Sequence, residues 1–162
     1  MPAKAKIILG IDPGFHRVGW GIIKSSSNGI KAEKYGVIET SKKIAFNQRL
    51  KQIHEEVADL IKKHKPGLAG VERLFFSKNI KTAMQVSEAR GVILLTLAEG
   101  NIPVFECTPQ AVKQSLVAYG RAEKSQIQSM VKTLLKLPAI PKPDDVADAL
   151  AIAITAAFSA KL

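Results

Sequence analysis

The sequence predicts a single α/β domain, residues 1–162, in which five short strands alternate with helices. Two observations predict this class. Short apolar runs closed by turn residues, such as residues 7–12, are typical of buried strands. Longer segments, including 44–63 and 79–99, carry apolar residues at helical spacing. With 162 residues, 46% of them hydrophobic, the chain has enough apolar material for one core.

Charge and composition narrow the range of partners. The chain has 24 Lys and Arg against 14 Asp and Glu, a formal net charge of +10. This excess favours a polyanionic partner, most often nucleic acid, although a merely basic surface is the alternative. Three of the five aspartates fall within five residues, at Asp144, Asp145 and Asp148. One cysteine, Cys107, excludes an internal disulfide and a multi-cysteine metal site.

The chain carries no membrane or export signal that the sequence reveals. No apolar run approaches the roughly 20 residues of a membrane span, and the lysines near the N-terminus are not followed by the apolar core of a signal peptide. We therefore expect a soluble cytoplasmic protein.

The first predicted strand, residues 7–12, ends on a carboxylate, Asp12, which precedes Pro13-Gly14. Two interpretations stay open from these residues alone. Asp12 either starts a turn with Pro13-Gly14 or is part of a functional site at the C-terminal end of the strand. In the next predicted strand, residues 18–24, Gly19 and Gly21 share one face and leave space that we place near Asp12. A charged edge strand, residues 30–38, follows.

The helix predicted over residues 44–63 has an apolar stripe, and we assign Arg49 to its polar face. The strand predicted over 68–72 then repeats the pattern of the first: a short apolar run that ends on a carboxylate, Glu72. Two core strands that each deliver an acid at the carboxyl end favour a site at that edge of the sheet. The alternative is a surface ion pair between Glu72 and Arg73.

The segment after this strand holds two aromatic residues, Phe75 and Phe76, beside Lys78. They either form a corner of the core or expose a ring that stacks on bases. The helix predicted over 79–99 is apolar nearly all round in its second half, which indicates burial in a core or a subunit interface. Gly91 costs about 1 kcal/mol relative to Ala in mid-helix, so we expect something to pack closely there.

The last third of the chain is predicted as a fifth strand at 102–106 and three helices. Thr108 and Pro109 begin the first helix, which ends near Gly120. The second, residues 123–137, has a basic face. That face either binds DNA or is simply solvated; it comprises Lys124, Gln128, Lys132 and Lys136, with Lys113 and Arg121 nearby.

The third helix begins at the aspartates, after a proline-rich linker at 138–143. We take Asp144 as its cap. Asp145 and Asp148 are three residues apart and therefore point the same way. With Asp12 and Glu72 they make four carboxylates that could converge, and oxygen ligands of this kind favour Mg²⁺ or Mn²⁺. Two such ions on a basic protein predict metal-dependent phosphodiester hydrolysis.

These motifs resemble the RuvC family of bacterial Holliday junction resolvases, nearly end to end. The resembling stretches include Leu9-Gly10-Ile11-Asp12-Pro13-Gly14, Glu72 with Phe75, Lys78-Asn79, Ala89-Arg90-Gly91, Val112-Lys113-Gln114, Ala122-Glu123-Lys124-Ser125-Gln126 and Asp145-Val146-Ala147-Asp148-Ala149-Leu150. The resemblance implies an RNase H-like fold: a five-stranded mixed sheet flanked by helices. It also implies a homodimer that nicks two strands of a four-way DNA junction symmetrically, in recombination and repair, beside a branch-migration motor.

The resemblance also implies roles for particular residues. Asp12, Glu72, Asp145 and Asp148 match the family's catalytic metal ligands, for two Mg²⁺ ions with Mn²⁺ as a substitute. Basic residues near the scissile phosphate match Lys113 and Lys124, and the aromatic that stacks on junction bases matches Phe75. We expect further DNA contacts from Lys78, Asn79 and Arg121.

Two departures and two rival interpretations stand beside this resemblance. Phe15-His16 replaces the small hydroxyl and basic residues usual after Asp-Pro-Gly, which puts phosphate contacts there in doubt, and Arg73 is unusual after Glu72.

Ile11-Asp12-Pro13-Gly14 is also similar to the phosphate loop of actin-like ATPases, which need two such domains. A non-enzymatic junction-binding module would keep the lysines but would not need acids at the ends of two core strands.

Overall fold

A five-stranded sheet in the order β3-β2-β1-β4-β5 organises the molecule. The computed structural model of the chain describes residues 4–74, 80–118 and 120–160. β1 pairs antiparallel with β2 and parallel with β4, so the sheet is mixed, as expected. The strands are β1 (Lys6–Asp12), β2 (Arg17–Ser26), β3 (Gly29–Glu39), β4 (Leu68–Glu72) and β5 (Val104–Cys107).

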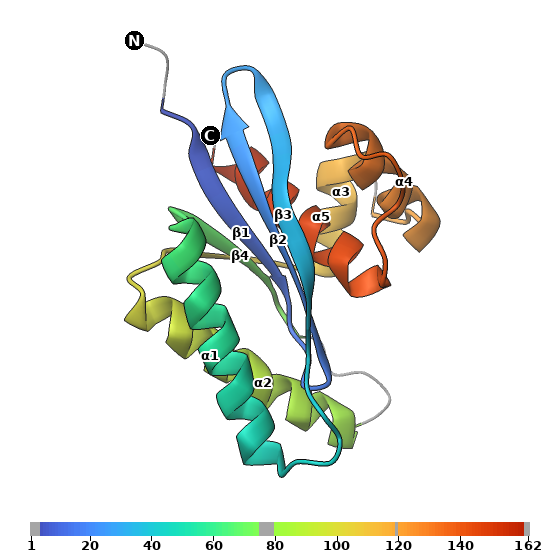
Figure 1. Cartoon of the computed structure of the whole chain (residues 1–162). Helices are drawn as coiled ribbons and strands as arrows, with labels where there is room; N and C mark the ends of the chain where they lie inside the picture. Colours follow the sequence, from blue (N-terminus) through green and yellow to red (C-terminus); the bar gives the residue numbers. More distant parts are fainter. Residues whose placement is uncertain (1–3, 75–79, 119, 161–162) are drawn as a thin grey trace.

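Helices cover both faces of this sheet (Figure 1). On one face lie α1 (Phe46–His64) and α2 (Ile80–Glu99). On the other lie α3 (Pro109–Val117), α4 (Lys124–Leu134) and α5 (Asp144–Ser159). Thr108 caps α3 as predicted, since its hydroxyl accepts a hydrogen bond from the Ala111 amide at 3.0 Å. Among the described residues, no helix is both long and apolar enough to cross a membrane.

α5 lies unusually close to the sheet, because the strand residues beneath it are glycines. A Cβ on Gly10 would stand 2.1 Å from the carbonyl oxygen of Ala149, and one on Gly19 would stand 2.0 Å from that of Asp145. No side chain fits at either distance, so only glycine permits this approach. The space that we predicted beside Asp12 is therefore real, and the backbone of α5 occupies it.

One helix boundary and one helix cap differ from the predictions. The helix predicted to reach residue 137 ends at Leu134, and Lys136 follows it with a positive φ of 52°. Lys136 therefore does not continue the basic stripe of α4. Asp144 is not the cap of α5: Pro143 takes that position, and the Asp144 carboxylate pairs instead with Lys142 at 3.2 Å.

One helical prediction was wrong about burial, and a second is tested only in part by a single chain. Arg49, assigned to the polar face of α1, is only 8% exposed, because it lies on the same side of the helix as Phe46 and Ile53. The second half of α2 is not covered all round within this chain. Leu95 is 57% exposed, and nothing lies within 4 Å of a Cβ placed on Gly91. The alternative of a subunit interface on α2 stays a prediction.

Candidate active site

Two acids stand side by side where β1 and β4 end. The strands are parallel neighbours whose register pairs Ile11 with Val71. Asp12 and Glu72 are the next and last residues of their strands. The carboxyl ends of parallel strands open onto one edge of a sheet, so this register alone places the two carboxylates together.

α5 brings the other two acids to the same edge. Gly19 is paired with Asp12 across β1 and β2, and it is Gly19 that the backbone of Asp145 approaches closely. The first turn of α5 therefore lies over the end of β1. Asp148 follows one turn later on the same side of the helix and faces the cavity described next. The structure thus places all four predicted acids at one edge of the sheet, near enough for the charges of Glu72, Asp145 and Asp148 to act on Asp12.

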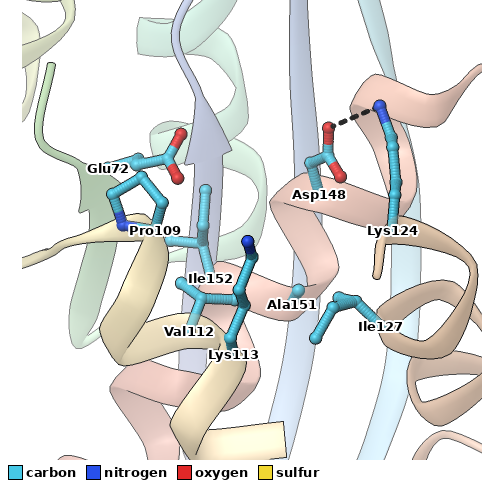
Figure 2. A pocket seen from close by; sticks show the side chains of 9 residues that line it. All are labelled: Glu72, Pro109, Val112, Lys113, Lys124, Ile127, Asp148, Ala151 and Ile152. Atoms are coloured by element: carbon cyan, nitrogen blue, oxygen red, sulfur yellow. Dashed lines mark ion pairs between the residues drawn. The ribbon is translucent and has the colours of Figure 1, made fainter. Parts of the chain in front are cut away.

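A cavity of about 300 Å³ opens beside them (Figure 2). Glu72 and Asp148 line it on two sides, and the Lys113 side chain points into the space between them. Lys124 closes the side next to Asp148. The rest of the lining is apolar: Pro109, Val112, Ile127, Ala151 and Ile152. Acids and lysines thus face each other in a hollow with apolar walls.

Burial and, after it, the charges of neighbouring acids raise the pKa values of Asp12, Glu72 and Asp148. Burial raises the pKa of Asp12 to about 8, and the charges of Asp148, Glu72 and Asp145 add to the effect. Burial and the charge of Asp148 raise the pKa of Glu72. Burial also raises the pKa of Asp148, although Lys124 opposes the shift. Each shift means that a positive charge placed among these groups would stabilise their ionised forms.

Lys124 already supplies one positive charge. Its ammonium lies 3.3 Å from Oδ2 of Asp144 and 3.7 Å from Oδ2 of Asp148. Burial acts to lower the pKa of Lys124, but the two carboxylates outweigh it and raise that pKa above its usual value. Lys124 therefore stays charged at the edge of the acid cluster.

The donor set suits a hard divalent cation. Four carboxylates without histidine or thiolate partners are the ligands that Mg²⁺ and Mn²⁺ prefer, and Cys107 is buried away from the cavity lining. In the parts of the chain that the structure describes, no three acidic, histidine or cysteine side chains are already grouped closely enough to hold an ion. Binding would therefore draw the carboxylates toward a shared cation and offset their repulsion.

The other predicted site residues are distributed less compactly. Asp145 borders a second hollow with Gly14–Arg17 and Val86 rather than the cavity of Figure 2. Arg121 is exposed just before α4. Phe75, Lys78 and Asn79, predicted to contact DNA, lie outside the described residues.

The sequence analysis did not predict the arginine that holds the end of β4. Arg90 Nε donates a hydrogen bond to the Glu72 carbonyl oxygen at 2.9 Å. Arg73 does not pair with Glu72 as the alternative interpretation supposed. Its Nε lies 2.9 Å from Oε2 of Glu106, whose other oxygen is 3.3 Å from Arg90. The sequence did contain a signal for Arg90, because Ala89-Arg90-Gly91 is one of the motifs that carry the family resemblance.

Comparison with known proteins identifies the family. The family model described as crossover junction endodeoxyribonuclease RuvC matches residues 8–156. A curated relative with that name from Ruminiclostridium cellulolyticum is 53% identical over 148 residues, 91% of this chain and 89% of the relative. The chain belongs to the RuvC family. It is therefore an endodeoxyribonuclease that cleaves crossover (Holliday) junctions, and the actin-like ATPase and the non-enzymatic binding module are both excluded.

Solved structures of RuvC agree with the fold. Thermus thermophilus RuvC superposes with a TM-score of 0.89 at 33% identity, over 96% of this chain and 95% of that one. The same protein in complex with a Holliday junction substrate gives a TM-score of 0.91. The sheet and its helices thus form the RNase H-like fold of the RuvC family, whose members are metal-dependent nucleases.

Proposed function

We propose that this RuvC-family chain resolves four-way DNA junctions through a site in which Asp12, Glu72, Asp145 and Asp148 hold two Mg²⁺ ions, which Mn²⁺ can replace. One observation carries the proposal: the acids that end β1 and β4 and the acids of α5 lie at one edge of the sheet, where Glu72 and Asp148 line a cavity together with two lysines. When bound, such ions supply an activated water and stabilise the charge on the leaving 3′ oxygen.

The protein's own residues would orient the substrate. Lys113 points into the cavity between Glu72 and Asp148, where an ammonium can bind a phosphate oxygen. We propose that Lys124, which pairs with Asp148 in this structure, exchanges that contact for the scissile phosphate once the acids hold cations. The apolar walls lower the local dielectric beside these groups and so strengthen their charge interactions.

Paired nicking requires two such sites, and we propose a two-fold homodimer through α2. An apolar stripe on this helix is exposed in the single chain: Ile80 is 69% exposed, and Met84 and Leu95 are each 57% exposed. Gly91 lies on the same helix with open space around it. A two-fold dimer presents two identical sites to a junction of matching symmetry, so symmetric nicks follow.

Junction selectivity would come from shape and backbone contacts rather than from extensive base readout. We assign the stacking contact to Phe75 and phosphate or base contacts to Lys78, Asn79 and Arg121. A branch-migration motor bound to the same junction completes the proposed assembly. This work takes place on the chromosome, which in a bacterium lies in the cytoplasm.

The test is cleavage of an end-labelled four-way junction at neutral pH, with Mg²⁺ or with a chelator, beside a linear duplex of the same sequence. We expect symmetric paired nicks that require Mg²⁺ and spare the duplex. Asp12→Asn should bind the junction and leave it uncut. Nicks that persist in chelator, or a duplex that is cut equally well, would contradict the proposal.

A further inference from the structure

Arg49 is a buried cation on α1. It is 8% exposed, and among the described residues no carboxylate forms an ion pair with it. A guanidinium cannot shed its charge at any ordinary pH. Burying it without an acid costs several kcal/mol unless other acceptors replace the lost water. The groups that accept its hydrogen bonds therefore indicate what it does.

Those acceptors belong to the turn that follows Asp12 and to the residue after β3. Arg49 Nε donates to Oγ1 of Thr40 at 2.9 Å, and Nη2 donates to the carbonyl oxygen of Phe15 at 3.2 Å. The guanidinium carbon also lies 5.0 Å from the centroid of the Phe15 ring, within cation–π range. Arg49 thus contacts both the backbone and the ring of Phe15.

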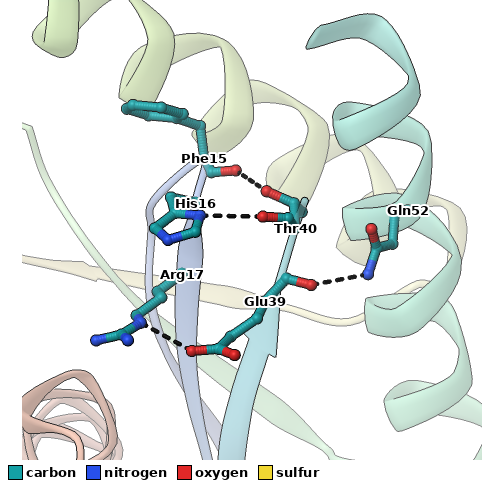
Figure 3. Close-up of polar contacts among 6 residues, drawn as sticks. All are labelled: Phe15, His16, Arg17, Glu39, Thr40 and Gln52. Carbon is teal, nitrogen blue, oxygen red and sulfur yellow. Dashed lines mark hydrogen bonds and ion pairs between the residues drawn. The ribbon is translucent and has the colours of Figure 1, made fainter. Parts of the chain in front are cut away.

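Thr40 holds the same turn by a second set of bonds (Figure 3). Its hydroxyl donates to the Phe15 carbonyl oxygen, and its amide donates to the His16 carbonyl oxygen at 2.9 Å. In return, Nδ1 of His16 donates to the Thr40 carbonyl oxygen at 3.0 Å. The Thr40 hydroxyl is therefore both the acceptor for Arg49 and the donor to Phe15, so these groups form one connected network.

The held turn is part of the active-site edge. It continues β1 directly after Asp12, and it is closed so tightly that a Cβ on Gly14 would stand 2.1 Å from the Arg17 carbonyl oxygen. Gly14–Arg17 also borders the hollow that Asp145 lines. A shift of this turn would move the backbone that carries Asp12 and the wall beside Asp145.

We propose that Arg49 is a positioning residue of the nuclease. It fixes the turn 13–17 against Thr40, and this keeps Asp12 and Asp145 in the positions from which both can bind the same cation. The inference rests on the proposed function of these acids. Phe15 and His16 are the residues that depart from the family's usual pattern at this turn. The network around Arg49 thus gives them a structural role where a phosphate contact was in doubt.

The experiment compares Arg49→Met, Arg49→Lys and the control Ile53→Ala, which opens a cavity one helical turn further along the same helix and leaves every hydrogen bond of the turn in place. For each folded dimer, thermal unfolding, Mn²⁺ affinity by calorimetry without DNA, junction binding in Ca²⁺ and single-turnover cleavage would be measured. We expect Arg49→Met to lower the cleavage rate by about 10- to 100-fold and to weaken Mn²⁺ binding by about 10-fold. Its junction affinity should stay within about threefold, and Arg49→Lys should recover part of the loss. Ile53→Ala should lower the unfolding temperature without either functional change.

The outcomes separate this inference from the proposed function. If Arg49→Met matches Ile53→Ala in Mn²⁺ affinity and cleavage, Arg49 only packs α1 against the sheet and the inference is wrong. If wild-type protein binds no Mn²⁺ and cuts no junction, the proposed function itself fails. Should Arg49→Met not fold, the near-isosteric Thr40→Val removes the hydroxyl that links Arg49 to Phe15. Thr40→Val should weaken Mn²⁺ binding and slow cleavage, each by less than Arg49→Met does. Unchanged Mn²⁺ affinity and cleavage in Thr40→Val would overturn the inference.

Discussion

The two faces of the sheet are packed in different ways. On the face covered by α1 and α2, aliphatic side chains interlock, among them Leu9, Ile11, Val71, Ile53 and Ile93. On the face covered by α5, Gly10 and Gly19 let the backbone of the helix approach the strands directly. The first face is packed by side chains alone, whereas the second combines a side-chain core, which includes Ile8, Ile23 and Leu150, with a direct backbone contact at the glycines.

The difference has a functional consequence. Side-chain packing absorbs small changes of volume, because neighbours can repack around them. A helix backbone held against strand backbone has no such freedom, and the acids of α5 are therefore placed as rigidly as the helix itself. Metal-dependent chemistry needs that rigidity, since an error of about 1 Å can cost about 100-fold in rate. The site lies on the face that tolerates least change.

The largest effect expected from this contrast is on cleavage. Asp148→Asn removes a carboxylate on α5 that faces the cavity, and we expect cleavage of a four-way junction to fall by about 1,000-fold. Junction binding should stay within about threefold, because phosphate contacts from lysines remain. The matched control is Asp59→Asn, an exposed acid of α1 on the other face, which should leave the rate unchanged. Equal rates for the two variants would contradict the assignment.

Gly19→Ala tests the close approach itself. The added methyl would meet the Asp145 carbonyl oxygen at 2.0 Å, so α5 must move, and we expect a loss of about 3 kcal/mol in the free energy of unfolding. Gly67→Ala adds the same methyl where nothing lies within 4 Å and should change stability by no more than about 0.5 kcal/mol. Urea denaturation measures both, and a tolerated Gly19→Ala would show that the contact is loose.

The raised pKa of Asp12 predicts a pH dependence in metal-free protein. The folded pKa is about 8 against an ordinary value of 3.8. Between these values the native state keeps a proton that the unfolded chain has lost, so stability falls as the pH rises and levels off above about pH 8. Asp12→Asn removes the part of this slope that Asp12 contributes and should be more stable than wild type at pH 8 by about 2 kcal/mol. Urea titrations in chelator at pH 5 and pH 8 measure the free energy of unfolding of both proteins. If that free energy changes equally between the two pH values in wild type and in Asp12→Asn, the prediction is refuted.

The smallest effect is expected on the aliphatic face. Ile53→Val removes one methylene from a fully buried side chain of α1 and should cost about 1 kcal/mol of unfolding free energy. Because the change is far from α5, the cleavage rate of the folded protein should match wild type. A rate loss larger than about threefold would show that the two faces are coupled.

Much of the site could be predicted from local pattern. Apolar runs that end in Asp12 and Glu72 predict strand ends, and the three-residue spacing of Asp145 and Asp148 predicts a shared helix face. Arg49 was mispredicted because charged residues are assigned to the polar face by default. Its burial depends on acceptors from Phe15 and Thr40, which are far from it in sequence. The Asp144 cap was wrong because Pro143 takes the cap position, so that Asp144 is already the first residue of the helix, and its carboxylate pairs with Lys124 and Lys142.

The convergence of four carboxylates on shared cations is tested most directly by anomalous diffraction from crystals of the protein soaked in Mn²⁺. We predict anomalous peaks enclosed by the carboxylates of Asp12, Glu72, Asp145 and Asp148, and their loss in crystals of Asp12→Asn. Peaks only at other surface acids, or peaks among the four residues that survive Asp12→Asn unchanged, would contradict the account.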